Sequence, residues 1–333
     1  MKKIGLTTTV PVEVLLAAGY MPVDINNIFI TDKHYFQYID MAERDGFPKS
    51  TCAWIKGIYG VCLSKGIDEI VGVVEGDCSN TRALLEVLSL KGIKVYPFSY
   101  PHSHTLSDVE KEIRKFMDMF GVQHREVEKI KKEAEELRQL AKKIDRLTYA
   151  HNKATGFENH LYQVSMSDFN GDRETFRKQM EQKINEIESR KSDDTKIRLG
   201  YIGVPPMTGD LYDFAETLNA RIVYNEVQRE FAFPRAGYAA NIFEQYYDYT
   251  YPYDIEFRIQ EIQKQIDARK IDAIVHYTQA FCYRAIEDIV VREKLGIPVL
   301  NIEGDKLNGL DARTKLRIEA FVDMVYDMKE HKG

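Results

Sequence analysis

Three of the four cysteines occupy positions typical of metal ligands. Cys78 follows the apolar run 70–74 through a Glu-Gly-Asp turn, and Cys282 follows a similar run that ends at residue 277. Cys52 directly precedes a helical pattern over 53–64. We expect each of them at a helix N-terminus, where unpaired N–H groups and a partial positive charge lower a thiol pKa and stabilise anionic clusters. The pattern predicts metal or redox chemistry.

The fourth cysteine, Cys62, is expected to stand apart from the other three. It lies on the same predicted helix as Cys52, about 15 Å further along at 1.5 Å per residue, so the two cannot share one site. A buried thiol is its expected state. Three remaining thiolates allow an iron–sulfur cubane with one open iron or a zinc site with bound water. Buried cysteines with only a structural role are the further alternative.

Three other side chains near the Cys78 turn and a later strand could move protons. Glu75 and Asp77 flank the glycine of that turn, where carboxylates serve either in proton transfer or as simple caps. His102 follows the end of the predicted strand 93–97 and is the candidate proton donor there, although a loop histidine is also compatible with a surface role.

The elements that must position these residues indicate an α/β fold with parallel sheets. Short β-rich runs alternate with helical patterns, which is typical of right-handed crossovers and flavodoxin-like, or Rossmann-like, lobes. A chain of 333 residues is also long enough for two cores. We expect an N-terminal lobe over 1–160 with two of the cysteines and a C-terminal lobe over 161–333 with the third. The second lobe has predicted strands at 196–204, 220–226, 272–277 and 297–302.

A helical insertion is predicted between the lobes. Apolar residues recur at intervals of three and four over 127–144 and again over 176–187. The polar stretch 150–171 is the expected crossing into the second lobe. A long segment with many tyrosines, 231–253, has no clear period and is expected to be an ordered loop that faces the cleft between the lobes.

Composition excludes several classes of protein. The net charge of -6 and a pI near 5.8 give no general attraction to nucleic acid. No apolar run approaches the roughly 20 residues that a membrane span needs. The N-terminus lacks the pattern of a signal peptide, so we expect a cytoplasmic protein whose cysteines are not disulfide-bonded.

Motifs along nearly the whole chain resemble one enzyme family. The opening segments 7–13 and 17–24 are similar to the N-terminal signature of 2-hydroxyacyl-CoA dehydratase and benzoyl-CoA reductase subunits. The spacing of Cys52, the Gly-Asp-Cys turn at 76–78 and Cys282 after a late strand resemble the same family. Segment 296–305 followed by 313–321 looks like its closing motif.

The resemblance implies a [4Fe-4S] cluster held by Cys52, Cys78 and Cys282, and two flavodoxin-like lobes. It implies two kinds of partner: an ATP-dependent activator that supplies single low-potential electrons, and a second family subunit or a second copy of the chain. The implied reaction is an oxygen-sensitive radical dehydration of a 2-hydroxyacyl-CoA, in which a ketyl radical makes a β-proton acidic. The open iron would act as a Lewis acid.

Other functions remain compatible with the sequence. Some members of the resembled family reduce benzoyl-CoA. Others reduce small molecules at a double-cubane cluster, and four cysteines are too few for such a cluster unless two chains share it. A non-enzymatic two-lobe protein that binds a small molecule is the alternative from another class.

Overall fold

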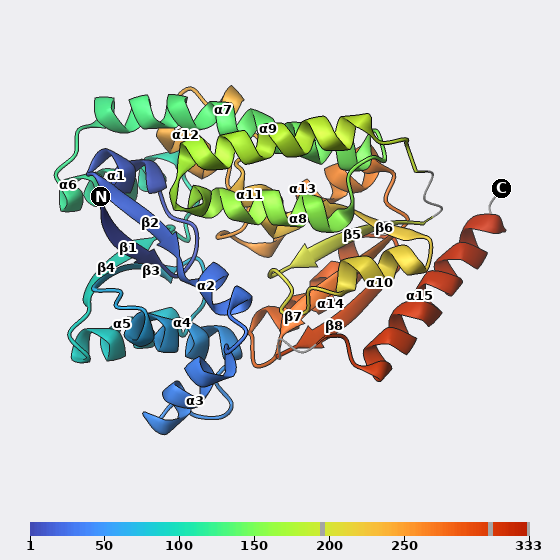
Figure 1. Ribbon diagram of the computed structural model, residues 1–333, viewed down its shortest axis with the longest axis horizontal. Helices are drawn as coiled ribbons and strands as arrows, with labels where there is room; N and C mark the ends of the chain where they lie inside the picture. The colour runs from blue at the N-terminus through green and yellow to red at the C-terminus, as the bar shows by residue number, and fades with distance from the viewer. Residues whose placement is uncertain (194–196, 306–308, 332–333) are drawn as a thin grey trace. The chain divides into compact units, whose positions relative to one another are not determined.

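The computed structural model describes residues 1–193, 197–305 and 309–331, and Figure 1 shows its elements. Contacts divide the chain into two compact units. Unit 1 comprises Met1–Gln139, Ser165–Arg177 and Phe233–Asp254, and unit 2 comprises Leu140–Val164, Lys178–Ala232 and Ile255–Gly333.

Unit 1 is built on a four-stranded parallel sheet with strand order β2-β1-β3-β4. The strands are β1 (Lys2–Leu6), β2 (Tyr20–Asp24), β3 (Glu69–Glu75) and β4 (Lys94–Ser99). The helices between and after them are α1 (Val12–Ala17), α2 (Ile25–Thr31), α3 (Phe36–Arg44), α4 (Ala53–Ser64), α5 (Thr81–Leu90) and α6 (Leu106–Phe120). Later segments add the short helix α12 (Ile242–Tyr247) and three 3₁₀ turns, η1 (Ser165–Ser167), η2 (Phe169–Gly171) and η3 (Ala236–Tyr238).

Unit 2 repeats the same strand order, as β6-β5-β7-β8, again all parallel. The strands are β5 (Ile197–Gly203), β6 (Ala220–Asn225), β7 (Ala273–Gln279) and β8 (Val299–Gly304). Its helices are α8 (Gly156–Val164), α10 (Leu211–Thr217), α11 (Glu226–Phe231), α13 (Ile255–Arg269), α14 (Arg284–Lys294) and α15 (Ala312–Glu330). Helices α7 (His124–Tyr149) and α9 (Arg173–Ser189) each contribute residues to both units.

The sheet of unit 2 is covered on both faces, as a parallel sheet requires. One apolar cluster joins strand side chains such as Tyr201 and Val275 to α10 and α15. A second cluster joins the alternate side chains, such as Ile202 and Ile274, to α13 and α14. Successive strand residues therefore point into opposite cores.

The predicted fold class is confirmed, since two parallel four-stranded sheets with many helices form two flavodoxin-like lobes. The helix predicted over 53–64 is α4, and the two periodic patterns are α7 and α9. Residue 196, the expected first residue of a strand, lies outside the described residues, and β5 is described from Ile197.

Strands β1 and β2 were not predicted. Both have only five residues, and β2 contains Pro22. Proline is tolerated there because β2 is an edge strand, where one side of the backbone makes no ladder hydrogen bonds. A proline inside a short run hides such a strand from pattern analysis.

The contact-based units differ from the expected boundary near residue 160. The polar stretch 150–171 contains α8 and two 3₁₀ turns, and it contributes to both units. The tyrosine-rich segment is ordered, as expected, and contains η3 and α12, but residues 233–254 belong to unit 1. Their aromatic side chains pack with Tyr100 of that unit, an interaction between residues too distant in the chain for sequence periodicity to reveal.

Among the described residues, no helix combines the length and the apolar character needed to cross a lipid bilayer.

Helices α3 and α4 pack very closely where Gly60 faces Tyr38. A Cβ atom on Gly60 would lie 2.4 Å from the Cα atom of Tyr38 and 2.5 Å from its carbonyl oxygen. Backbone atoms cannot swing away as a flexible side chain can, so a larger residue would force the helices apart. Because Cys52 is the N-cap of α4, this packing also fixes where that thiol lies in unit 1.

We expect Gly60→Ala to lower the free energy of unfolding by ~1–3 kcal/mol, the usual effect of overpacking, although alanine is the better helix former. Urea denaturation followed by circular dichroism measures this. Gly209→Ala is the matched control, because a Cβ atom there would meet nothing within 4 Å. Equal stability of the two variants would contradict the close packing.

Candidate functional site

Each sheet places one cysteine in the same topological position. In the first sheet, β2 lies on one side of β1 and β3 lies on the other, so the direction of winding reverses between β1 and β3. The second sheet reverses in the same way between β5 and β7. Open α/β sheets bind ligands beyond the carboxyl ends of the strands at such a point. Cys78 is the third residue after β3, and Cys282 is the third residue after β7. The expectation that both thiols follow a strand is confirmed.

The turn that carries Cys78 is tightly enclosed within unit 1. Gly76 has a φ of 89°, and a Cβ atom on it would lie 2.7 Å from both the carbonyl oxygen of Pro252 and the Cβ atom of Tyr100. The tyrosine-rich segment therefore packs directly against this turn. Helix α5 begins at Thr81, three residues later than predicted, and the Thr81 N–H donates to the carbonyl of Cys78 at 3.1 Å.

The turn that carries Cys282 has a similar hydrogen-bond pattern. The Cys282 N–H donates to the carbonyl of Gln279 at 3.0 Å, and the Cys282 carbonyl accepts from Ala285 at 3.1 Å. Phe281 adopts the left-handed conformation with a φ of 63°. Helix α14 begins at Arg284, so Cys282 lies in the turn that leads into it. Both strand-end thiols are partly exposed.

Cys52 is the N-cap of α4, as predicted, with an extended backbone and 7% exposure. It shares unit 1 with Cys78, whereas Cys282 belongs to unit 2. Within 1–193, 197–305 and 309–331, no group of three or more His, Cys, Asp or Glu side chains is arranged to hold a metal ion. The shared three-thiolate centre therefore stays a prediction.

Cys62 has the properties expected of a core residue. It is 1% exposed in α4, and burial raises the pKa of its thiol to about 12. A thiol with that pKa stays protonated at neutral pH and is a poor metal ligand.

The predicted proton-transfer residues lie at the carboxyl ends of β3 and β4. The exposed Glu75 carboxylate accepts a hydrogen bond from the backbone N–H of His102 at 3.1 Å, so these two residues are neighbours. Glu75 also lines an open cavity of about 890 Å³ together with Arg82 and Lys115. Asp77 is partly buried in the turn between Gly76 and Cys78. A role for any of these residues in chemistry stays a prediction.

The other histidine of this loop is held by the tyrosine-rich segment. The ring of His104 stacks on Tyr253 with a centroid distance of 3.7 Å, and its Nε2 atom lies 2.8 Å from the carbonyl oxygen of Tyr247. Both contacts favour a structural role for His104.

Sequence reasoning missed a buried ionic network behind the loop that follows β1. The Arg138 guanidinium of α7 donates to Glu13 of α1, and Gln245 and Tyr246 of α12 donate to the same carboxylate at 2.8 Å each. Burial alone would raise the pKa of Glu13, but the charge and hydrogen bonds of Arg138 hold it below its ordinary value. A charged residue within the apolar run 10–16 is the signal that could have revealed it.

Unit 2 has a comparable network beside the Cys282 turn. Arg258 of α13 donates to both carboxylate oxygens of Glu226, at 2.8 and 3.0 Å, and to Glu287 of α14 at 2.6 Å. Glu226 also accepts from the Gly203 N–H at the end of β5, and Arg284 donates to Glu287 at 3.3 Å. Burial disfavours the charged Glu226, but Arg258 keeps the pKa of that carboxyl below its ordinary value. These hydrogen bonds connect the start of α14 to the end of β5 and the start of α11.

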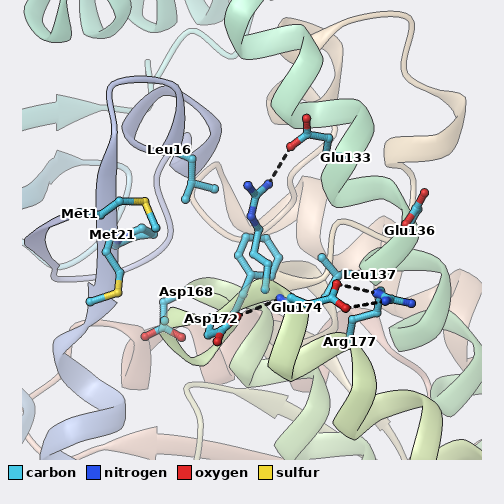
Figure 2. A pocket seen from close by; sticks show the side chains of 14 residues that line it. Met1, Leu16, Met21, Glu133, Glu136, Leu137, Asp168, Asp172, Glu174 and Arg177 are labelled. Atoms are coloured by element: carbon cyan, nitrogen blue, oxygen red, sulfur yellow. Dashed lines mark hydrogen bonds and ion pairs between the residues drawn. The ribbon is translucent and has the colours of Figure 1, made fainter.

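A separate pocket of about 560 Å³ lies along the edge strand β2 in unit 1 (Figure 2). It is lined by residues of β2, α7 and α9, among them Glu133 and Arg173, which form an ion pair at 3.2 Å. At its wall, Asp168 accepts a hydrogen bond from the Asp24 N–H at 2.8 Å. Burial, and then the charge of Asp24, raise the pKa of Asp168 to about 7. None of the lining residues belongs to the loops after β1, β3 or β4, so this pocket is not part of the cysteine site.

We expect Arg138→Met to lower the free energy of unfolding by ~3–5 kcal/mol, because Glu13 would be left buried without its cation. The double variant with Glu13→Gln should recover part of this loss. Denaturant titration at pH 7 is the measurement, and Arg82→Met, which removes an exposed i,i+4 ion pair, is the control with a change below ~1 kcal/mol. A loss no larger than that of the control would show that the network adds little.

The buried carboxyl pair predicts a pH dependence. Because the folded state raises the pKa of Asp168, it retains a proton that the unfolded chain releases above about pH 4. This pair's contribution to stability is therefore greatest at low pH, falls as the pH rises, and levels off above about 7. Relative to the wild type, Asp168→Asn should remove that fall. Unfolding midpoints at pH 5 and 7.5 measure this fall, and Asp172→Asn, at an exposed residue of the same pocket, is the control. An identical change of stability between the two pH values in all three proteins would contradict the raised pKa of Asp168.

Comparison with known proteins identifies one family. No curated protein matches the chain. A family model described as 2-hydroxyglutaryl-CoA dehydratase, D-component, matches residues 7–325. That range includes every strand except β1 and all four cysteines. The chain therefore belongs to the 2-hydroxyglutaryl-CoA dehydratase D-component family and is a dehydratase-type enzyme component.

Proposed function

We propose that this chain is the iron–sulfur subunit of a 2-hydroxyacyl-CoA dehydratase-type enzyme, with a [4Fe-4S] cluster held by Cys52, Cys78 and Cys282. One observation carries the proposal: two sheets of identical strand order each present a cysteine as the third residue beyond the equivalent strand. A purely structural role would not require a cysteine at the ligand-binding edge of both sheets.

The donor set fits an iron–sulfur cluster. All three residues are thiols: Cys52 is the N-cap of α4, and Cys78 and Cys282 lie in the turns that lead into α5 and α14. Cys78 and Cys282 are partly exposed and accessible to iron, whereas Cys62 is buried and protonated. When bound, a cluster with three protein ligands supplies one open iron as a Lewis acid and a path for single electrons.

The chain's own residues then bind, orient and exclude water. The enclosed Gly76 turn and the packed aromatic segment fix the direction of Cys78, and the Arg258 network fixes the helix behind Cys282. Glu75 is the group best placed to move a proton, since the His102 N–H holds its carboxylate beside the Cys78 turn. Asp77 and His102 are the further candidates for proton transfer.

The proposal includes partners and a setting. An acyl-CoA is the substrate, an ATP-dependent activator supplies electrons, and a second family subunit or another copy of the chain completes the enzyme. The family match supports a component of a larger dehydratase. Low-potential electrons and an open iron make the enzyme oxygen-sensitive and suit the cytoplasm of an anaerobic cell.

Anaerobic purification followed by iron and acid-labile sulfide analysis tests the cluster. The wild type should be brown, with about four iron and four sulfide per cluster-bearing chain. Cys52→Ser, Cys78→Ser and Cys282→Ser should each lose most of the iron and the visible absorption. Cys62→Ala is the matched control and should retain both.

Two outcomes would overturn the proposal. One is a colourless wild type that carries stoichiometric zinc after strictly anaerobic preparation. The other is full iron content in Cys282→Ser, which would mean that unit 2 supplies no ligand. Circular dichroism of each variant separates loss of the cluster from loss of the fold.

A further inference from the structure

The last helix of unit 2, α15, is apolar on two opposite faces. Its inner face packs against the sheet through Ile318, Phe321, Val322 and Val325. Its outer face exposes a stripe with four-residue spacing, consisting of Leu316, Ala320, Met324 and Met328. Leu316 is 64% exposed, and Met324 is 42% exposed. A surface helix normally places polar residues opposite its buried face, so an apolar outer stripe indicates a second surface that covers it.

Charges on the same outer face are separated by sign along the helix. Arg313 and Arg317 lie in the N-terminal half, whereas Asp323 and Asp327 lie in the C-terminal half, and all four are exposed. The acidic half also borders a shallow depression of about 720 Å³ that includes Ala320 and the two methionines. A partner for this surface must therefore be acidic at one end, basic at the other and apolar between.

The outer face of α15 is complementary to a second, antiparallel copy of itself that is centred on Ala320. Arg313 and Asp327 lie seven residues to either side of Ala320, and Arg317 and Asp323 lie three residues to either side. Leu316 and Met324 lie four residues to either side. Offsets of three, four and seven residues return to nearly the same side of an α-helix. Every pair that would meet across an antiparallel two-fold axis is thus attractive or apolar.

We propose that two copies of this chain associate through antiparallel α15 helices on a two-fold axis at Ala320. The small side chain at the axis lets the two backbones approach closely. Arg313 pairs with Asp327 of the other copy, Arg317 with Asp323, and Leu316 packs on Met324. This is an isologous interface, in which the same patch serves both partners. This self-complementarity favours a second copy as the partner. Binding to an unrelated protein would not require residues to be placed symmetrically about Ala320.

The contact does not depend on the proposed cluster, since α15 carries none of its ligands. One guanidinium nitrogen of Arg317 already donates to the carbonyl of Asn301 in β8 at 2.7 Å, so changing Arg317 would also remove a contact within unit 2. Arg313 and Asp327 are the better pair to change, because both are exposed and lie at the ends of the stripe.

Analytical ultracentrifugation of the full-length, anaerobically purified chain tests the interface. The wild type should sediment as a dimer that weakens with added salt, because exposed ion pairs are screened. Arg313→Asp and Asp327→Arg should each weaken the dimer at least about tenfold, since each places like charges opposite each other at both ends. An equimolar mixture of the two variants should form dimers again, because each then supplies the charge that the other lacks.

The Ala320→Glu variant tests the axis itself. It places two carboxylates together and should give a monomer, while Leu90→Glu, at an 85% exposed position of α5 in unit 1, should leave the dimer unchanged. A monomeric wild type would overturn the proposal. A dimer that survives both single charge reversals would overturn it as well, as would failure of the mixture to reassociate although each variant keeps its circular dichroism spectrum. Iron content measured on the same samples reports on the cluster separately.

Discussion

The site depends on one geometric constraint, the reversal of winding in a parallel sheet. In such a sheet all carboxyl ends lie at one edge, and the loops that follow two neighbouring strands diverge where the winding changes direction. Both units have the same strand order and therefore the same divergence, after β1 and β3 and after β5 and β7. Cys78 and Cys282 lie in equivalent loops because the two sheets have the same strand order.

Buried ion pairs brace the helices near these loops. Glu13 with Arg138 ties α1 to α7 and α12 in unit 1, and Glu226 with Arg258 and Glu287 ties the start of α11 to α13 and α14 in unit 2. Removing charges from water is expensive, and apolar residues would often stabilise a core equally well. Ion pairs differ from apolar contacts in requiring definite directions. They hold helix starts in one orientation, which the proposed ligand set would need.

The sequence revealed the features that repeat locally and missed those that join distant residues. The apolar period identified α4, α7 and α9, and the strand–turn–cysteine pattern placed Cys78 and Cys282 correctly at strand ends. It could not find β1 or β2, which are short and, in β2, interrupted by Pro22. Nor could it pair Glu13 with Arg138, which are 125 positions apart, or assign residues 233–254 to the first unit. Such contacts have no period, and only the folded chain brings them together.

The two units are interleaved along the chain. Unit 1 includes residues 165–177 and 233–254, which follow the first residues of unit 2 in the sequence. Helices α7 and α9 each have residues in both units. A single cut in the gene therefore cannot release either lobe whole. The two lobes share one strand order, but neither is encoded by one continuous segment, so recombination at a single point cannot exchange a whole lobe. The two lobes must therefore evolve together within one gene.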